Sequence, residues 1–336
     1  MSVLVYTESE GGNFKKIAFE AVSYAKGIAD MLGTSVTALS INGNNTDQLG
    51  KYGASKVLQV SNDQLQDFNA SAYADTISQA AKNEASQVVV ITSSANSKYL
   101  ALDVITTSAN SKYLAPLLAV NLEAGYVSNV TELPTSASPF NVTSNVFSNK
   151  AFATTEITTE SKLLGLAKNA YGLVENETSV TCENFSPNIS DNDLNTKIAS
   201  VEKANDKVTI ADADIVVSGG RGLKGPENWG MVEELAETLG AATACSKPVS
   251  DLGWRPHSEH VGQTGKPVSS NLYIAIGISG AIQHLAGVNA SKVKVVINND
   301  PEAPFFKAAD YGIVGDAFEF VPQLIEKLKE FKSNNA

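Results

Sequence analysis

A short glycine-rich turn, Gly277-Ile278-Ser279-Gly280, is the segment around which the candidate chemistry gathers. It follows an apolar run from Leu272 to Ile276 and precedes a helix pattern that starts near Ala281. A strand, a tight turn and a helix in this order present unpaired backbone N–H groups, to which phosphates and ribose hydroxyls bind. The spacing is not G-x-G-x-x-G, so the turn alone is a weak signal. Two neighbouring turns strengthen it: Ser218-Gly219-Gly220-Arg221-Gly222 upstream, and the turn from Asn298 to Pro304 downstream.

Arg221 has the strongest local case for binding a ligand through its side chain. Its glycine neighbours let the backbone approach a ligand, and a guanidinium can hold a pyrophosphate through two N–H groups. The alternative is an arginine in a surface ion pair. His257, His260 and His284 are the only histidines, and their spacing fits no metal site. Sequence order pairs no nucleophile with a base, so we expect a cofactor to supply the chemistry.

The composition is typical of a soluble globular protein that is long enough for two domains. The chain has 336 residues, of which 43% are hydrophobic and 18% charged. A net charge of −11 argues against a nucleic-acid binder. Two widely separated cysteines, Cys182 and Cys245, suit a reducing compartment. No apolar run approaches 18 residues and the start carries no targeting pattern, so we expect a cytoplasmic protein that is not embedded in a membrane.

Residues 1–190 are predicted to form an α/β domain with a mainly parallel sheet, because strand-like runs alternate with helix patterns. The strand-like runs are Val3–Tyr6, Val36–Ile41, Lys56–Val60 and Val88–Ile91, and the helix patterns cover Phe14–Leu32 and Ala72–Glu84. Shorter segments at 126–131, 140–146, 151–158 and 161–166 are predicted to be antiparallel strands that complete this domain.

The sequence from Val90 to Ala101 recurs almost unchanged from Val104 to Ala115, with one difference, Ser93 against Thr107. Two copies are too few for a repeat architecture. A parallel sheet has one position for this strand, so we interpret 90–115 as a local duplication, natural or artefactual, with one copy inserted. The second copy continues into Pro116 and is predicted to occupy the helix position after the strand.

Residues 208–336 are predicted to form a second domain, a doubly wound parallel sheet, after a polar, acidic linker at 191–207. Its predicted elements are a strand at Ala213–Val217, a helix at Trp229–Leu239, a strand around 241–246, a strand at Leu272–Ile276, strands at Lys294–Ile297 and Tyr311–Val314, and a helix at Val321–Lys332.

Three segments, in this order and spacing, resemble the alpha subunit of electron-transfer flavoprotein: IVVSGGRGLKGPENW, VGQTGKPVSSNLYIAIGISGAIQHLAG and VVINNDPEAPFFKAADYGIVGDAF. The resemblance is dense from about Ile215 to the end of the chain and loose over residues 1–200. It implies that the first domain is an α/β layer, that the second is the flavin domain, and that the cofactor is FAD.

The resemblance also implies which residues contact FAD. Lys247 stands where many members carry an arginine near the isoalloxazine that favours its anionic one-electron-reduced form; lysine keeps the charge but loses the planar fork. Thr264 would hydrogen-bond the flavin N5, and His284 would donate near the C2 carbonyl. Asp316 matches an acid near the adenine end. The full set of implied contacts is Arg221, Ser246, Lys247, Val261, Gly262, Gln263, Thr264, Ser279, Gly280, Ala281, Ile282, Gln283, His284, Asn298 and Asp316.

Several of these residues also have a simpler interpretation when the resemblance is set aside. Lys247 could equally be a solvated surface lysine. A lone helical histidine such as His284 is more often a packed, half-buried residue. Asp316 could serve as the N-cap of the helix before Phe318.

The function implied by the resemblance is electron transfer in fatty acid beta-oxidation. The chain would pair with the electron-transfer flavoprotein beta subunit as a heterodimer, accept electrons from acyl-CoA dehydrogenases or other flavin dehydrogenases, and pass them singly to electron-transfer flavoprotein–quinone oxidoreductase. An electron-bifurcating variant with a second FAD in the beta subunit and NADH as a partner stays open. So do a pyridine-nucleotide-binding dehydrogenase domain, which the missing G-x-G-x-x-G disfavours, and a non-redox nucleotide-binding module.

Overall fold

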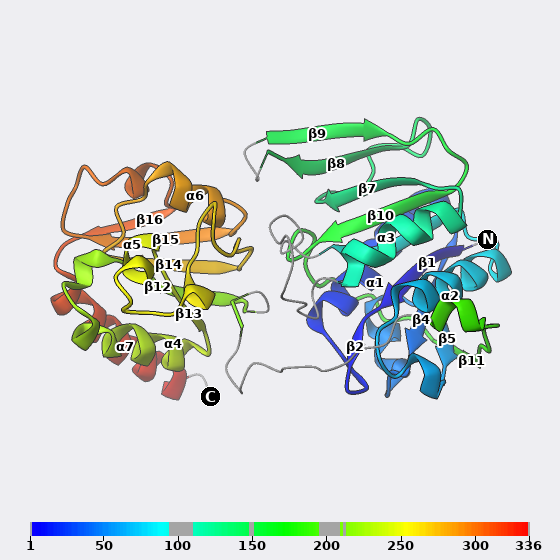
Figure 1. The fold of residues 1–336 in the computed structure, drawn as a ribbon, viewed down its shortest axis with the longest axis horizontal. Helices are drawn as coiled ribbons and strands as arrows, with labels where there is room; N and C mark the ends of the chain where they lie inside the picture. The colour runs from blue at the N-terminus through cyan, green and yellow to red at the C-terminus, as the bar shows by residue number, and fades with distance from the viewer. Residues whose placement is uncertain (1, 94–109, 148–150, 195–208, 211–212, 335–336) are drawn as a thin grey trace. The chain divides into compact units, whose positions relative to one another are not determined.

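The computed structural model of the chain describes residues 2–93, 110–147, 151–194, 209–210 and 213–334. Two compact units are present: unit 1 contains Met1–Val146 and Ala151–Val201, and unit 2 contains Glu202–Ala336 (Figure 1). Each unit has its own sheet and its own cores. A mixed α/β architecture with two separate sheets confirms the predicted fold class.

Unit 1 is built on a nine-stranded sheet in the order β11-β5-β4-β1-β6-β10-β7-β8-β9. The strands are β1 (Ser2–Thr7), β4 (Ser35–Ile41), β5 (Lys56–Val60), β6 (Val88–Ser93), β7 (Gly125–Val130), β8 (Asn141–Val146), β9 (Ala151–Glu156), β10 (Lys162–Ala167) and β11 (Thr181–Asn184). From β11 to β7 neighbouring strands are parallel, and β8 pairs antiparallel with both β7 and β9. A separate small hairpin joins β2 (Ser9–Glu10) and β3 (Asn13–Phe14).

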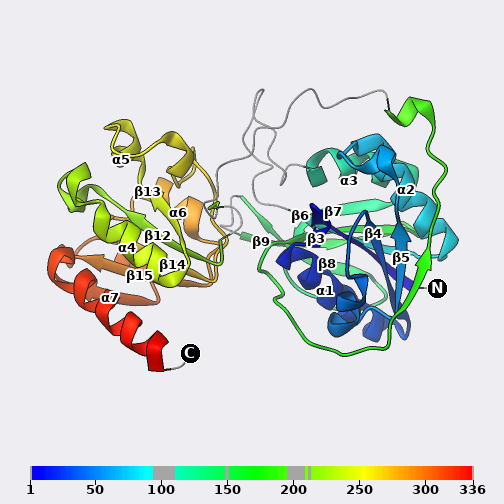
Figure 2. The same cartoon turned by 90° about the horizontal axis from the view of Figure 1, so that it is seen from below.

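Helices cover both faces of this sheet, as Figure 2 shows for α1 on one side and α2 and α3 on the other. The helices are α1 (Lys16–Leu32), α2 (Ala70–Asn83) and α3 (Asn110–Asn121). Along β1, Val3 and Val5 face the core under α1, while Leu4 and Tyr6 face the core under α2 and α3. The period-2 alternation of a strand therefore supplies apolar side chains to both layers at once.

Capping residues fix the start of α2 and the end of α1. The Asn69 side chain accepts hydrogen bonds from the backbone N–H groups of Ser71 and Ala72 and begins α2. Gly33, with φ 65°, ends α1 in the left-handed conformation.

The prediction that segment 161–166 is an antiparallel strand is wrong. Segment 161–166 forms β10, which lies between β6 and β7 and is parallel to both. Leu163, Leu164 and Leu166 are completely buried. A strand covered on both faces is apolar throughout rather than alternating, and the run from Leu163 to Ala167 has this character. The antiparallel prediction holds for β8 and β9 and for the β7–β8 pair.

The chain from 168 to 180 crosses from β10 to the edge strand β11 without a helix. We call it the belt; it is the green chain that runs past α1 in Figure 2. The buried Glu20 of α1 accepts hydrogen bonds from the backbone N–H groups of Asn169 (2.9 Å), Tyr171 (2.9 Å) and Gly172 (2.8 Å). Farther along, the Ser23 hydroxyl bonds both the N–H and the C=O of Val174 at 3.1 Å. Side chains of one helix thus satisfy backbone groups that would otherwise be paired by secondary structure.

Unit 2 is built on a five-stranded sheet in the order β13-β12-β14-β15-β16, with every pair parallel. Its strands are β12 (Ile215–Gly219), β13 (Ala242–Cys245), β14 (Leu272–Ile276), β15 (Val293–Asn298) and β16 (Tyr311–Val314). Its helices are α4 (Gly230–Leu239), α5 (Lys247–Asp251), α6 (Ile282–Val288) and α7 (Ala317–Asn334). Residues of α4 and α7 build the core on one face, and the segment around α6 contributes to the other core with Val261 and Phe305 (Figure 1).

Two predictions fall partly outside the described residues. The duplicated segment at 90–115 has its first strand residues in β6 and its last residues in α3, the helix position predicted for the second copy; positions 94–109 lie outside the described residues. The linker at 191–207 begins with a short 3-10 turn at Asp191–Leu194 and is otherwise outside them, so these domain limits stay a prediction. Among the described helices, none is both long and apolar enough to cross a membrane.

Candidate cofactor-binding site

All the predicted contact segments of unit 2 lie at or beyond the carboxyl ends of its strands. The register pairs Gly219 of β12 with Cys245 of β13 and with Ile276 of β14, and pairs Asn298 of β15 with Val314 of β16. Because the strands are parallel, their carboxyl ends meet at one edge of the sheet, and the turns that follow them gather there.

The strand order reverses direction between β12 and β14, and the turns after these two strands touch each other. The N–H of Gly220 donates to the C=O of Ile276 at 2.8 Å, and the N–H of Gly222 donates to the C=O of Gly277 at 3.1 Å. A Cβ on Gly277 would lie 2.8 Å from the Cα of Gly222. This contact is made by backbone alone, and it lies at the point where doubly wound sheets bind their ligands.

A second close contact joins the Val261–Thr264 segment to α6. A Cβ on Gly287 would lie 2.6 Å from the Cα of Gly262. The N–H of Gln263 donates to the C=O of Gln283 at 2.7 Å, and the N–H of Val261 donates to the C=O of Cys245 at 2.9 Å. The segment is therefore fixed both to α6 and to the end of β13.

The predicted contact residues divide into an exposed set and a buried set. The exposed residues are Arg221, Lys247, Gln263, Thr264, Ser279, Ala281, Ile282 and Gln283, and the buried ones are Ser246, Val261, Gly262, Gly280, His284 and Asn298; Asp316 alone is half-buried. Ile282 is 66% exposed, which is unusual for a large aliphatic side chain at the start of a helix. The exposed set offers charges, hydroxyls, amides and one apolar surface to a ligand, while the buried set shapes the turns.

Asn298 and Asp316 have side chains that are already engaged within the protein. Asn298 Nδ2 donates to the C=O of Ile278 at 3.0 Å, and its Oδ1 accepts from the N–H of Asp300 at 3.0 Å. Asp316 Oδ1 accepts from the N–H of Phe318 at 2.9 Å, at the start of α7. Asp316 is thus the helix cap that its sequence context allowed, and it follows the outermost strand, β16. A contact of either residue with a cofactor stays a prediction.

His284 is the most informative of the buried residues. Its ring is 7% exposed, and its Nε2 lies 3.0 Å from the hydroxyl of Tyr273 on β14. Burial, with a smaller contribution from nearby His260, lowers the pKa of His284 to about 4, and a hydrogen bond with the Val261 backbone opposes the shift. The imidazole is therefore neutral at pH 7. Its buried Nδ1 has no hydrogen-bond partner of normal geometry among the described residues. An unsatisfied buried ring nitrogen costs about 1–3 kcal/mol, so this atom fits a ligand that supplies the missing partner.

Three residues of the site were missed by sequence reasoning: Tyr273, His260 and Arg255. Tyr273 is hidden in an apolar strand pattern. His260 directly precedes the Val261–Thr264 segment, is buried, and has its Nε2 3.4 Å from the position that a Cβ on Gly262 would take. The i,i+4 spacing of Arg255 and Glu259 was the only sequence signal for the third residue.

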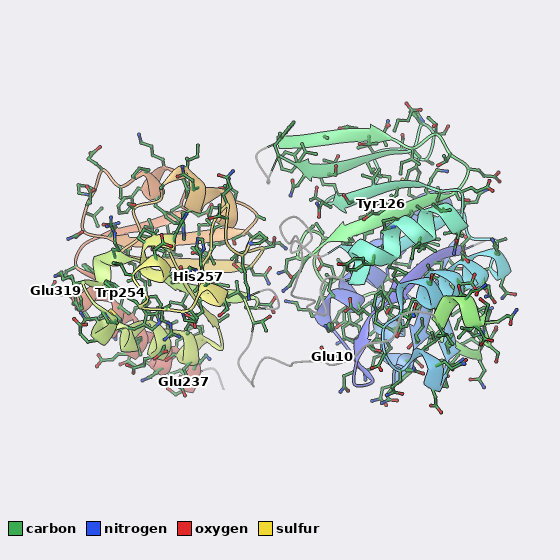
Figure 3. All side chains as sticks on the ribbon, viewed as in Figure 1. Glu10, Tyr126, Glu237, Trp254, His257 and Glu319 are labelled. Atoms are coloured by element: carbon green, nitrogen blue, oxygen red, sulfur yellow. The ribbon has the colours of Figure 1, made fainter. Side chains whose placement is uncertain are left out.

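Arg255 forms a clamp across the loop between α5 and the 3-10 turn η8 (His257–Glu259), which Figure 3 marks by Trp254 and His257. Its Nε and Nη2 donate to the carboxylate of Glu259 at 2.8 and 2.7 Å, and its Nη1 donates to Glu233 of α4 at 3.1 Å. The guanidinium carbon lies 5.4 Å from the ring centre of Trp229, which packs against Gly219. Glu259 ends the 3-10 turn η8 (His257–Glu259), so the clamp fixes the chain just before Val261.

The described residues offer little for catalysis without a cofactor. They contain no cluster of three or more His, Cys, Asp or Glu that could hold a metal ion. Ser250 and His257 do come together, with Oγ 2.8 Å from Nδ1, but the serine is buried at 5% exposure and would not reach a substrate. The arrangement is suited to holding a molecule whose own chemistry is then used.

Comparison with known proteins gives two family matches. Residues 209–289 match the family described as the electron transfer flavoprotein FAD-binding domain, and residues 3–188 match the electron transfer flavoprotein domain. The electron transfer flavoprotein subunit alpha of Thermoanaerobacterium thermosaccharolyticum is 36% identical, over 98% of both chains. That of Bacillus subtilis is 35% identical, over 98% of this chain and 97% of its own length. The mitochondrial one of Dictyostelium discoideum is 51% identical over 43% of this chain and 40% of its own.

Proposed function

Because the chain belongs to the electron transfer flavoprotein alpha-subunit family, we propose that it holds FAD at the carboxyl edge of unit 2 and uses it as a carrier of single electrons. The supporting observation is the backbone cradle formed by two glycine contacts, Gly222–Gly277 and Gly262–Gly287, next to a buried histidine nitrogen that lacks a partner. The isoalloxazine supplies the redox chemistry when it is bound, and the protein supplies position and electrostatics.

Each part of the cradle is assigned a task. The turn at Gly219–Gly222 with Arg221 and the start of α6 bind the pyrophosphate. Lys247 and Thr264 are exposed and would hold the ring, where a positive charge and a hydroxyl would stabilise the reduced cofactor. His284 Nδ1 would hydrogen-bond a carbonyl of the ring.

The proposed partners follow from the family. A beta subunit completes the heterodimer, acyl-CoA dehydrogenases or other flavin dehydrogenases donate the electrons, and electron-transfer flavoprotein–quinone oxidoreductase accepts them in fatty acid beta-oxidation. An electron-bifurcating variant would carry a second FAD in the beta subunit and use NADH. The cytoplasmic location stays a prediction.

The experiment is co-expression with the beta subunit encoded in the same host, followed by a visible spectrum and chromatography of the extracted cofactor. We expect flavin absorption in the blue and FAD in the extract. One FAD per heterodimer supports the simple carrier, and two support the bifurcating variant. A colourless complex that takes up no added FAD would refute the proposal.

A pair of variants tests the site itself. Thr264→Val removes the hydroxyl proposed to face the ring, and Thr238→Val, as a matched control, removes a hydroxyl of α4 on a half-buried side chain, which donates to the C=O of Glu234 at 2.8 Å. One lost hydrogen bond of about 1.4 kcal/mol corresponds to a shift of roughly 60 mV in a one-electron potential. We expect a shift on this order for Thr264→Val alone; equal potentials in both variants would exclude Thr264 from the site.

A further inference from the structure

Tyr273 is a completely buried phenol whose hydroxyl lies 3.0 Å from Nε2 of His284. Its ring lies parallel to Phe305, with an interplanar angle of 4° and ring centres 6.4 Å apart. The Ser218 hydroxyl on the neighbouring strand β12 lowers the pKa of the same phenol, but it makes no hydrogen bond of normal geometry among the described residues. His284 Nε2 is therefore the acceptor within reach of the Tyr273 O–H.

The direction of this hydrogen bond determines where the imidazole proton resides. Burial raises the pKa of Tyr273 far above its usual value, so the phenol keeps its proton. His284 is neutral and carries one N–H. If the phenol donates to Nε2, the imidazole proton must sit on Nδ1.

The opposite direction is less favourable by a count of unsatisfied groups. If Nε2–H donated to the phenol oxygen, both the phenol O–H and the lone pair of Nδ1 would be buried without a partner. In the first arrangement the Nδ1–H is the one group of the phenol and the imidazole that lacks a partner of normal geometry among the described residues. Each unsatisfied buried group costs about 1–3 kcal/mol, so the phenol is the donor.

We propose that Tyr273 is a positioning residue: it holds His284 in the tautomer with the proton on Nδ1, so that the ring presents a donor rather than a lone pair to the bound cofactor. This inference rests on the proposed function for its second half, because it takes the cofactor to be FAD with a carbonyl at Nδ1. A donor there stabilises negative charge on that carbonyl, whereas a lone pair would repel it. Tyr273 itself does not need to touch the cofactor.

The test uses nitrogen NMR of the full chain labelled with ¹⁵N, because the two ring nitrogens of a neutral histidine differ strongly in shift according to which one is protonated. With three histidines in the chain, His257→Gln and His260→Gln assign the signals of His284. We expect Nδ1 of His284 to be protonated at pH 7 before and after FAD is added.

Tyr273→Phe removes the hydroxyl and keeps the ring that packs against Phe305. We expect the His284 proton to shift at least partly to Nε2 in the FAD-free chain and the FAD dissociation constant to rise on the order of 10-fold, the equivalent of one hydrogen bond. Ser218→Ala is the matched control: it removes the other buried hydroxyl beside the phenol and should change neither measurement.

Two results would overturn the role of Tyr273: an Nε2-protonated His284 in the unmodified chain, which can be read even if Tyr273→Phe does not fold, or an unchanged tautomer in Tyr273→Phe. A different result separates the proposed function from this inference. If the tautomer responds as expected but the unmodified protein with its beta subunit binds no FAD, the tautomer control by Tyr273 stands and the flavin assignment falls.

Discussion

Replacing Gly277 by alanine tests whether backbone contact between the two switch-point turns is needed, and Gly240→Ala is its matched control. The two glycines have nearly the same conformation, φ 63° at Gly277 and φ 67° at Gly240. A Cβ at Gly240 would meet nothing within 4 Å, whereas at Gly277 it would lie 2.8 Å from the Cα and 3.1 Å from the carbonyl carbon of Gly222. The variants therefore share the conformational penalty and differ in the contact.

The expected magnitudes follow from these two terms. Alanine in the left-handed region costs about 1–2 kcal/mol, and the gain from a less flexible unfolded chain returns about 0.4–1 kcal/mol in both variants. Forcing a methyl group against fixed backbone adds about 1–3 kcal/mol. We expect Gly240→Ala to lower the free energy of unfolding of unit 2 by about 1 kcal/mol and Gly277→Ala to lower it by about 2–4 kcal/mol.

The assay is urea unfolding of the full chain, followed by tryptophan fluorescence. Both tryptophans, Trp229 and Trp254, belong to unit 2, so the signal reports this unit selectively. The slope with urea should be unchanged, so that the midpoint carries the difference. Equal losses in the two variants would show that Gly277 is needed only for its backbone conformation, and the argument from close contact would fail.

Two further predictions concern the buried histidines and the loop clamp. Because the pKa of His284 is lowered to about 4 in the fold, the unfolded chain binds a proton more readily between that value and about 6.5, so the stability of unit 2 should fall as the pH drops through this window, by about 3 kcal/mol from His284. Burial lowers the pKa of His260 as well, so this residue adds to the loss in the same direction. In His284→Gln, tryptophan-monitored unfolding should show a free energy of unfolding that depends less on pH. An unchanged dependence would contradict the lowered pKa of His284. Arg255→Lys loses the two-pronged hydrogen bond to Glu259 and the stacking on Trp229, so it should destabilise unit 2 by about 1–2 kcal/mol and speed FAD release. Glu233→Gln changes a half-exposed partner of Arg255 and should cost less than about 0.5 kcal/mol. Comparable effects of the two variants on the urea midpoint and on the FAD release rate would argue against the clamp.

The order of the elements could be predicted from the sequence because each one carries its own period. Runs such as Val36–Ile41 and Leu272–Ile276 became β4 and β14 almost to the residue. The error at β10 has a physical cause. Whether a strand is parallel or antiparallel depends on which strands lie beside it, and the residues of Lys162–Ala167 do not encode their neighbours. The apolar run from Leu163 to Ala167 is the signal that the sequence offers for a strand buried on both faces.

The candidate site divides along a similar line. Turns that follow strands are visible in the sequence, since glycines mark them, and so the segments around Arg221, Gly262 and Gly277 were identified. Two side-chain contacts could not be identified in this way: the hydrogen bond between Tyr273 and His284, which are 11 positions apart, and that between Arg255 and Glu233, which are 22 positions apart. Tertiary packing decides that these residues meet. The local pattern predicts where a backbone turns, and tertiary contacts decide which side chains then meet.

The belt of unit 1 has a consequence for how that unit loses its structure. Strand β11 lies at the outer edge of the nine-stranded sheet and would ordinarily fray first, as edge strands with exposed residues do. Here the chain that leads to it is hydrogen-bonded to Glu20 and Ser23, which lie in the first half of α1. Releasing the belt removes the hydrogen-bond partners of the buried Glu20 carboxylate. We therefore expect the edge strand β11 and helix α1 to unfold together, as one cooperative unit.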